Sequence, residues 1–189
     1  MRSLAVLASL VVFSLFGAAS VHAAEVDGVK VADTANVAGS DLVLNGAGVR
    51  TKVFFKVYLA SLYVPVKVKT TDAVVAKGPR RMQLNMMRGL EAKTLVEALN
   101  EGLTNNNTAA ELTAVKAEHD KLVAAMNALP ALKEGDVITF DFADDVTTLA
   151  LNGKSKGSYA GAAFNAAILK AWLGSKPVQD DLKKKLLGG

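Results

Sequence analysis

Apolar and polar positions alternate over much of the first half of the chain, which predicts a β-sheet. From Leu44 to Pro65 most residues are β-branched, aromatic or aliphatic, which favours one or two strands with a bend at Gly46-Ala47-Gly48. The segment from Val26 to Val37 is expected to form an edge strand or hairpin. After a turn at Lys77-Gly78-Pro79, the alternation from Met82 to Met87 predicts another strand with one face in the core.

Helical spacing replaces this alternation in the middle of the chain. Leucines recur every three or four residues from about Glu91, and this predicts a helix that stops in the Gly102 to Asn107 segment. Thr108 and Glu111 have the spacing of a capping box, in which the threonine accepts from an early N–H and the glutamate reaches back. A second helix is therefore expected to begin at Thr108 and to end at Pro130.

The last third of the chain repeats the order of strands followed by helices. Strands are predicted for Asp136 to Phe142 and Val146 to Leu151, and Asn152-Gly153 indicates a tight hairpin into a further strand because both residues accept positive φ. Helices are predicted for Ala162 to Leu173 and Pro177 to Leu187. This order predicts an α+β fold with a mostly antiparallel sheet in one domain.

The first residues have the pattern of a secretory signal peptide. A basic residue, Arg2, precedes an apolar stretch from Leu4 to Ala19 and small residues up to Ala23. Residues 1–23 are predicted to be removed, with cleavage after Ala23 or one residue later, which leaves a domain of residues 24–189 that is periplasmic or secreted. The alternative is an uncleaved membrane anchor. No other segment is expected to cross a membrane.

Composition excludes several classes of chemistry. The chain has no cysteine, so thiolate catalysis and iron–sulfur or zinc-thiolate sites are excluded. His22 lies in the leader, so His119 is left as the one histidine of the mature chain, where a position on the apolar face of its helix favours a core or boundary role. A Ser-His-Asp triad, a histidine metal site and a bound cofactor are therefore not expected. The two glycines at positions 46 and 48 lack the rest of a dinucleotide-binding motif.

Charge gives little indication of a macromolecular partner. The net charge of +4 falls to +3 without Arg2, the lysines are scattered, and the run Lys183 to Lys185 is interpreted as a solvated helix face. No nucleic-acid partner is expected. The acidic pairs Asp144-Asp145 and Asp180-Asp181 are interpreted as a solvated turn and a first helical turn. Oligomeric state stays open.

Arg50 is the most informative charged residue, because it lies among residues that are expected to be buried. A buried guanidinium requires an anion or a carbonyl to face. This combination indicates the floor of a ligand pocket. The alternative is an arginine whose donors are satisfied by backbone carbonyls or by an acid at the edge of the sheet.

Two separated segments resemble one known family. The sequence GAGVR followed by KVYLASLYVP, and the closing segment GSYAGAAFNAAILKAWLGSKPVQDDLKKKLLG from Gly157 to Gly188, are similar to the chalcone isomerase superfamily, in particular its bacterial chalcone-isomerase-like branch of exported proteins. The resemblance implies a large antiparallel sheet with helices layered on one face and a pocket between them. It covers nearly all of the mature chain.

The resemblance also implies roles for individual residues. Arg50 matches the family arginine that polarises a ketone in the isomerases and holds a carboxylate in the fatty-acid binders. Tyr58 matches the tyrosine that shares this carboxylate in the binders, where the plant isomerases have threonine. Asn100 matches the isomerase asparagine if Lys93 replaces its tyrosine partner, and Asn165 stands where the isomerases have a small hydroxyl residue. The isomerase set is thus broken.

These observations lead to one expectation about function and two alternatives. The expected function is binding, without turnover, of a small amphipathic carboxylate such as a fatty acid, with the carboxylate at Arg50 and Tyr58. Its hydrocarbon chain is expected to lie between sheet and helices, against Phe54, Met86, Leu99 and Phe164. The first alternative is an isomerase or intramolecular lyase of the chalcone isomerase type, with Arg50 as the catalytic electrophile. The second is an accessory protein whose pocket is vestigial and filled by its own side chains.

Overall fold

The computed structural model describes residues 23–189. The predicted signal peptide therefore lies outside the described residues, apart from Ala23, the residue that precedes the expected cleavage site.

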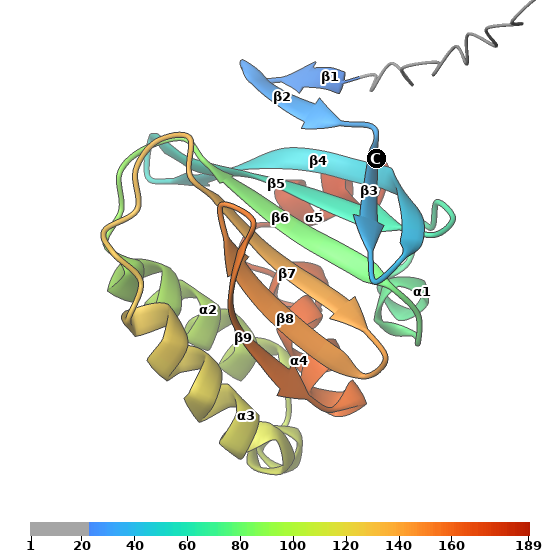
Figure 1. Ribbon diagram of the computed structural model, residues 1–189, viewed down its shortest axis with the longest axis vertical. Helices are drawn as coiled ribbons and strands as arrows, with labels where there is room; N and C mark the ends of the chain where they lie inside the picture. The colour runs from blue at the N-terminus through green and yellow to red at the C-terminus, as the bar shows by residue number, and fades with distance from the viewer. Residues whose placement is uncertain (1–22) are drawn as a thin grey trace, which may run out of the picture.

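A seven-stranded antiparallel sheet forms the centre of the molecule (Figure 1). Its strands run in sequence order across the sheet, so every neighbouring pair is joined directly or through a helical excursion. They are β3 (Thr34–Val37), β4 (Ser40–Lys52), β5 (Phe55–Val64), β6 (Arg80–Met86), β7 (Val137–Ala143), β8 (Val146–Leu151) and β9 (Lys154–Ala160). Before them, β1 (Ala23–Val26) and β2 (Val29–Ala32) form a separate two-stranded hairpin.

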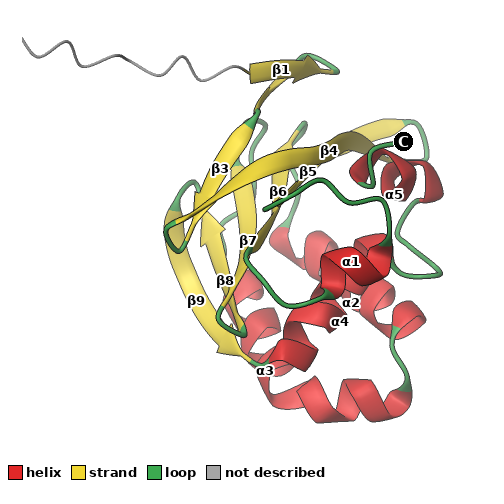
Figure 2. Ribbon diagram, turned by 90° about the vertical axis from the view of Figure 1, so that its right-hand side faces the viewer, coloured by secondary structure: helices red, strands yellow, loops and turns green. Residues whose placement is uncertain are grey.

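Within residues 23–189, five helices accompany the sheet, and Figure 2 shows that they gather on one side of it. They are α1 (Thr71–Val75), α2 (Ala92–Asn106), α3 (Ala109–Asn127), α4 (Ala162–Leu173) and α5 (Asp180–Leu186). Helix α4 contacts α2 and α3, and α5 lies against β4. The predicted α+β class, with a helix layer on one face of an antiparallel sheet, is confirmed.

The main core lies between the sheet and the helices. Helix α4 is apolar on nearly all sides because it is surrounded by the sheet and the other helices, and its Trp172 ring packs 5.8 Å from the Phe140 ring of β7. The opposite face of the sheet buries a smaller cluster against the β1–β2 hairpin. There Tyr63 is fully buried and donates a hydrogen bond of 3.0 Å to the Ala32 carbonyl.

Tight two-residue turns join most neighbouring strands. The predicted Asn152-Gly153 hairpin is confirmed, with φ of 51° and 75° at the two turn residues. The β7–β8 turn has the same geometry, with φ of 49° at Asp144 and 60° at Asp145. Such turns match the twist of the strands, so they hold the side chains at their tips in fixed directions.

Gly46-Ala47-Gly48 does not interrupt the strand, since these residues lie within β4, and the only irregularity there is a register shift between Leu44 and Gly46 in the described β4–β5 ladder. The glycines are needed there because α5 packs directly on the strand. A Cβ atom at Gly46 would lie 2.0 Å from the Lys185 carbonyl oxygen, and one at Gly48 would lie 2.9 Å from the Lys185 side chain. The turn comes instead at Val53 and Phe54, between β4 and β5.

The first long helix, α2, ends at Asn106, within the segment predicted for its stop, but Gly102 lies inside the helix and does not break it. Gly102 is buried, and a Cβ atom there would lie 2.9 Å from that of Ala171 on α4. This glycine marks the close approach of two helices and not a stop. The Thr108 to Glu111 capping box is confirmed at the start of α3. The last helix begins at Asp180, three residues later than Pro177 suggested, and the short helix α1 was not predicted.

Candidate functional site

Arg50 and Tyr58 lie side by side on the helix-facing side of the sheet. They are direct partners across the β4–β5 ladder, and partners across an antiparallel pair project their side chains from the same face. A register shift follows immediately, between Arg50 and Thr51, where the ladder is irregular. The sequence prediction that these two residues share one site is consistent with this placement.

The Arg50 guanidinium is half-buried and only partly satisfied by the protein. Its Nη1 donates to the Thr51 carbonyl at 2.6 Å and to Gln179 Oε1 at 3.3 Å. Its Nε and Nη2 form no hydrogen bond with any residue of the described chain and are not buried. Protein acceptors, as in the alternative interpretation of Arg50, therefore satisfy one of its three nitrogens. The other two remain available to an anion.

Gln179 fixes the backbone beside Arg50. It is the N-cap residue of α5, yet its side chain makes no capping bond and instead spans the edge of β4. Its Oε1 accepts from the Thr51 N–H at 2.9 Å, and its Nε2 donates to the Val49 carbonyl at 3.3 Å. This amide thus holds the start of α5 against the irregular part of the strand and limits the directions open to the guanidinium.

Tyr58 is fully buried and its hydroxyl is already engaged. The Trp172 indole N–H donates to it at 3.0 Å. Burial raises the pKa of the Tyr58 phenol above its ordinary value, with Trp172 and Arg50 opposing that rise. The phenol is therefore neutral at physiological pH, with its O–H proton free to donate to an acceptor in the cavity.

An apolar cavity lies beneath Tyr58, between the sheet and helices α2 and α4. Leu99, Met126 and Trp172 are among the side chains that enclose it. Its volume is about 10 Å³, no more than the roughly 10–15 Å³ that one water molecule requires. In this conformation the predicted hydrocarbon site is therefore filled by the protein's own side chains.

A small cleft of about 80 Å³ opens to solvent next to this cavity. Arg50 lies in the cleft together with polar side chains of α2 and of the segment before α5, which are Glu101, Asn105 and Lys176. Ala98 and Val178 line both the cleft and the cavity. These two small apolar residues form the wall that separates the charged group from the apolar interior.

Asn100 does not join this group. It lies on the other side of α2, where its Oδ1 is 2.8 Å from Nε2 of His119 on α3. Both residues line a shallow groove between the two helices. His119 is half-buried, and burial lowers the pKa of its imidazole while Asp120 raises it. The histidine thus has the boundary position that the sequence suggested.

The remaining predicted residues are distributed over the molecule. Leu99 lines the cavity, and Met86 is buried as the partner of Tyr58 on β6. Phe164 is buried elsewhere in the core, with its ring 6.1 Å from that of Tyr159. Asn165 lines a separate pocket. Phe54 lies at the tip of the β4–β5 hairpin with 91% of its surface exposed, so it does not line the cavity.

Two residues that form the site were not identified from the sequence. Trp172 lies within the predicted helix Ala162 to Leu173, and the need of a buried indole N–H for an acceptor is the signal that could have identified it. Gln179 follows Pro177 without any local pattern that predicts a contact 128 residues away along the chain. Its role depends on the packing of α5 against β4.

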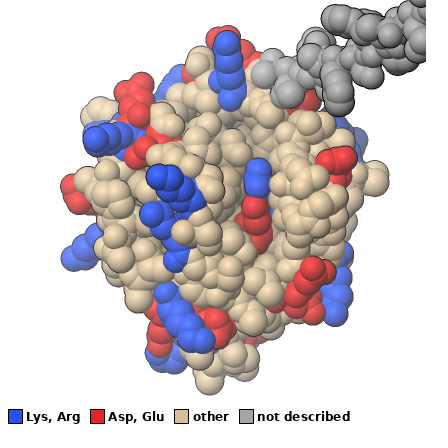
Figure 3. Space-filling model, viewed as in Figure 1, with Lys and Arg blue, Asp and Glu red and all other residues tan. Residues whose placement is uncertain are grey.

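Charge, metal and membrane features add little to the site. Figure 3 shows basic and acidic side chains interspersed over one face of the molecule. Within residues 23–189, no three histidine, aspartate or glutamate side chains gather in a way that could hold a metal ion. None of the helices in that same part of the chain combines the length and apolar character needed to cross a bilayer.

Comparison with known proteins identifies the family. No match was found among curated proteins. Among solved structures, a fatty-acid binding protein from Arabidopsis thaliana has a TM-score of 0.64 at 13% sequence identity, over 88% of this chain and 96% of the other. A likeness at that identity demonstrates a shared fold. A family model described as chalcone isomerase-like matches residues 23–188. Because this match spans the whole sheet and every helix, the chain belongs to the chalcone isomerase-like family.

Proposed function

We propose that this protein is an exported binder of a fatty acid or similar small amphipathic carboxylate, which it holds without turnover. The observation that carries the proposal is the half-buried Arg50, which lines a cleft and has two nitrogens without a hydrogen bond in the described chain, beside an apolar cavity that shares Ala98 and Val178 with the cleft. A guanidinium presents a planar pair of donors that matches a carboxylate. The fatty-acid binding of the Arabidopsis protein of similar fold supports the same class of ligand.

The ligand would enter along the line from the cleft to the cavity. The carboxylate would accept from Nε and Nη2 of Arg50 at the surface, and the hydrocarbon chain would pass between Ala98 and Val178 towards Leu99 and Trp172. Each buried methylene would contribute about 0.8 kcal/mol. Ten methylenes would therefore contribute about 8 kcal/mol before the cost of opening the cavity is subtracted.

Opening is a requirement of this proposal, because the cavity has a volume of only about 10 Å³. Helix α2 would have to move away from α4 and the segment before α5. The contact most directly involved is that between Gly102 and Ala171, where the two helices approach most closely. The bound and free forms would then differ in the spacing of these elements.

The first experiment is native mass spectrometry of the mature protein, purified without detergent, with organic extraction of any released mass. We expect a stoichiometric adduct of fatty-acid mass that is lost in Arg50→Ala. Arg88→Ala is the matched control, because this arginine lies over the Phe55 ring at the β4–β5 hairpin and not in the cleft. Retention of the adduct in Arg50→Ala, or its equal loss in both variants, would contradict the proposal.

One observation favours a second candidate function. The cavity is filled by the protein's own side chains, as expected for an accessory protein that acts through its surface. An adduct-free mass together with no effect of added dodecanoate on the melting temperature would favour this candidate. A chalcone ring-closure assay at matched pH tests the isomerase alternative, in which Arg50 would polarise a ketone and Tyr58 or a water would relay the proton.

A further inference from the structure

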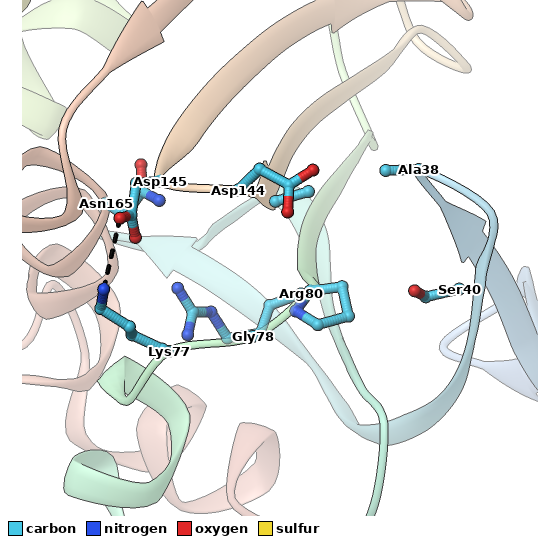
Figure 4. Close-up of a pocket in the computed structure, with 10 residues that line it drawn as sticks. Ala38, Ser40, Lys77, Gly78, Arg80, Asp144, Asp145 and Asn165 are labelled. Carbon is cyan, nitrogen blue, oxygen red and sulfur yellow. Dashed lines mark hydrogen bonds and ion pairs between the residues drawn. The ribbon is translucent and has the colours of Figure 1, made fainter.

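A second pocket, of about 300 Å³, lies away from Arg50 and shares no lining residue with its cleft or with the apolar cavity. It forms where the tips of the β3–β4 and β7–β8 hairpins meet the connection between α1 and β6 and the first turn of α4 (Figure 4). Its volume is at the lower end of the range of small-molecule sites.

Arg80 is the most unusual residue of this pocket. It is only 5% exposed, and its Nε and Nη1 are buried without any hydrogen-bond acceptor in the described chain. The ring of Phe142 lies 5.8 Å below the guanidinium and compensates for part of its lost hydration. A buried guanidinium with unpartnered donors is costly, and an acceptor bound in the pocket would offset that cost.

Asn165 offers a second donor to the same space. The Thr147 hydroxyl donates to Asn165 Oδ1 at 2.6 Å, and this bond fixes the amide with its Nδ2 group free. Backbone hydrogen bonds also hold the start of α4 next to the β7–β8 turn. The Gly161 N–H donates to the Asp145 carbonyl, and the Asn165 N–H donates to the Gly161 carbonyl. Figure 4 shows the Arg80 guanidinium on the side of the pocket where Lys77 and Asn165 lie.

The charges around the pocket leave two groups of opposite sign unpaired. Lys77 and Asp145 form an ion pair of 3.4 Å, so they largely cancel each other. Arg80 and Asp144 form no ion pair with any residue of the part that the structure describes. In Figure 4 Asp144 lies towards Ala38 and Ser40, away from the Arg80 guanidinium, so these two groups of opposite charge lie apart in the pocket, and Asp145 is the acid whose charge acts on Arg80.

We propose that this pocket binds a small zwitterion of the amino-acid class, whose carboxylate accepts from Arg80 and Asn165 and whose ammonium group faces Asp144. Asp144, which has no ion-pair partner in the described residues, pairs with an ammonium group and repels a phosphate dianion more strongly than a carboxylate monoanion. The positive φ of both Asp144 and Asp145 belongs to a tight two-residue turn, which places the Asp144 backbone at the rim of the pocket. This site is independent of the fatty-acid site proposed above.

Isothermal titration of the mature protein with ω-amino acids from glycine to 6-aminohexanoate tests this proposal. Butanoate, hexanoate and inorganic phosphate are titrated in parallel as single-charge and dianionic probes. We expect at least one zwitterion to bind about tenfold more tightly than the carboxylate of equal length, because one further charge-assisted contact is made. Absence of binding by every zwitterion, or tighter binding of phosphate, would overturn the assignment.

Variants separate the two ends of the ligand. Arg80→Gln should weaken binding of zwitterion and carboxylate alike by about tenfold or more, and Asp144→Asn should remove the preference between them. Asn165→Asp keeps the oxygen that accepts from Thr147 and replaces the amide donor by a negative charge, so it should also abolish binding. This variant tests the site if Arg80→Gln does not fold. Arg88→Ala should bind as the wild type does. Unchanged affinity in folded Arg80→Gln would refute the site.

Discussion

At the scale of single residues, replacing tyrosine by phenylalanine should have opposite effects at two positions. The Tyr58 hydroxyl accepts a hydrogen bond from Trp172, whereas the Tyr159 hydroxyl has no partner in the described chain. Tyr58→Phe leaves the buried Trp172 N–H without its acceptor, so it should lower the free energy of unfolding by about 1–3 kcal/mol. Tyr159→Phe removes a buried hydroxyl that has no partner in the described structure, so it should be neutral or stabilising. Chemical denaturation of both variants measures the difference, and equal losses would contradict it.

Val53 carries local backbone strain at the turn between β4 and β5. Its φ is 58°, a conformation that β-branched residues rarely adopt, and its side chain is 76% exposed. Val53→Gly should stabilise the folded state by about 1–2 kcal/mol because the strain is relieved. It should also stabilise the unfolded state by about 0.5–1 kcal/mol because glycine increases the entropy of the unfolded chain. We therefore expect a small increase in the denaturation midpoint.

Val66→Gly is the matched control for this substitution, because Val66 is 73% exposed and does not have a positive φ. The control should be destabilised by about 0.5–1 kcal/mol, since it gains chain entropy without relief of strain. A decrease of the same size in both variants would show that the Val53 turn stores no strain.

At the scale of elements, the start of α3 is tied to α4 through one carboxylate. Glu111 accepts from the Thr108 N–H at 2.7 Å and from Lys170 Nζ of α4 at 2.8 Å. The Lys170 contact, followed by the Thr108 bonds, lowers the pKa of Glu111 to about 2. Since the folded-state pKa is depressed, the stabilisation is complete above the ordinary value of 4.5 and is lost as the pH falls towards 2.

The measurable consequence is a pH-dependent effect of Glu111→Gln. The variant should melt below the wild type at pH 6, and the difference should shrink as the pH falls below 4.5 and be largely lost at pH 2, where about half of the wild-type carboxylates are protonated. Glu97→Gln on α2 is the control, because Glu97 lies 4.0 Å from Lys93 on the exposed helix surface and caps nothing. A difference between wild type and Glu111→Gln that stays constant with pH would contradict the assignment.

Local patterns predicted the elements well, and long-range contacts explain where those predictions were wrong. The Asn152-Gly153 turn and the Thr108 capping box depend on residues within a few positions of each other, and both are confirmed. Gly46 and Gly102 were interpreted as chain breakers. Each instead permits another element, Lys185 of α5 or Ala171 of α4, to approach closely. A single sequence does not reveal which distant segment requires the missing Cβ atom.

The same limit applies to the candidate site. The family resemblance implied that Arg50 and Tyr58 hold the same carboxylate, and the two residues are cross-strand partners. Trp172 and Gln179 complete their surroundings from segments more than 110 residues away. The sequence does not distinguish Arg80 from Arg81, because both follow the same turn. In the structure Arg81 pairs with Asp141, whereas Arg80 is buried without a hydrogen-bond partner for its Nε and Nη1 in the described chain.

At the scale of the whole molecule, the sheet is packed on both faces. Strand β3 contacts β6 and β7 on the face away from the helices, where Arg81 of β6 reaches the Asn36 carbonyl of β3 at 3.5 Å. On the other face, α2 and α4 close over the sheet and leave a cavity of only about 10 Å³. A ligand that lies between them must work against this packing, so its apparent affinity is reduced by the fraction of molecules in which the cavity is open.

Making room in the cavity should therefore strengthen ligand binding while weakening the fold. Leu99→Ala removes a buried side chain that lines the cavity, so it should cost about 2–5 kcal/mol of unfolding free energy and raise the affinity for dodecanoate. Leu122→Ala is the matched control, because Leu122 of α3 is equally buried but does not line the cavity. It should lose similar stability without any gain in affinity. Equal dodecanoate affinity in the two variants, measured by titration, would place the ligand outside the sheet–helix interface.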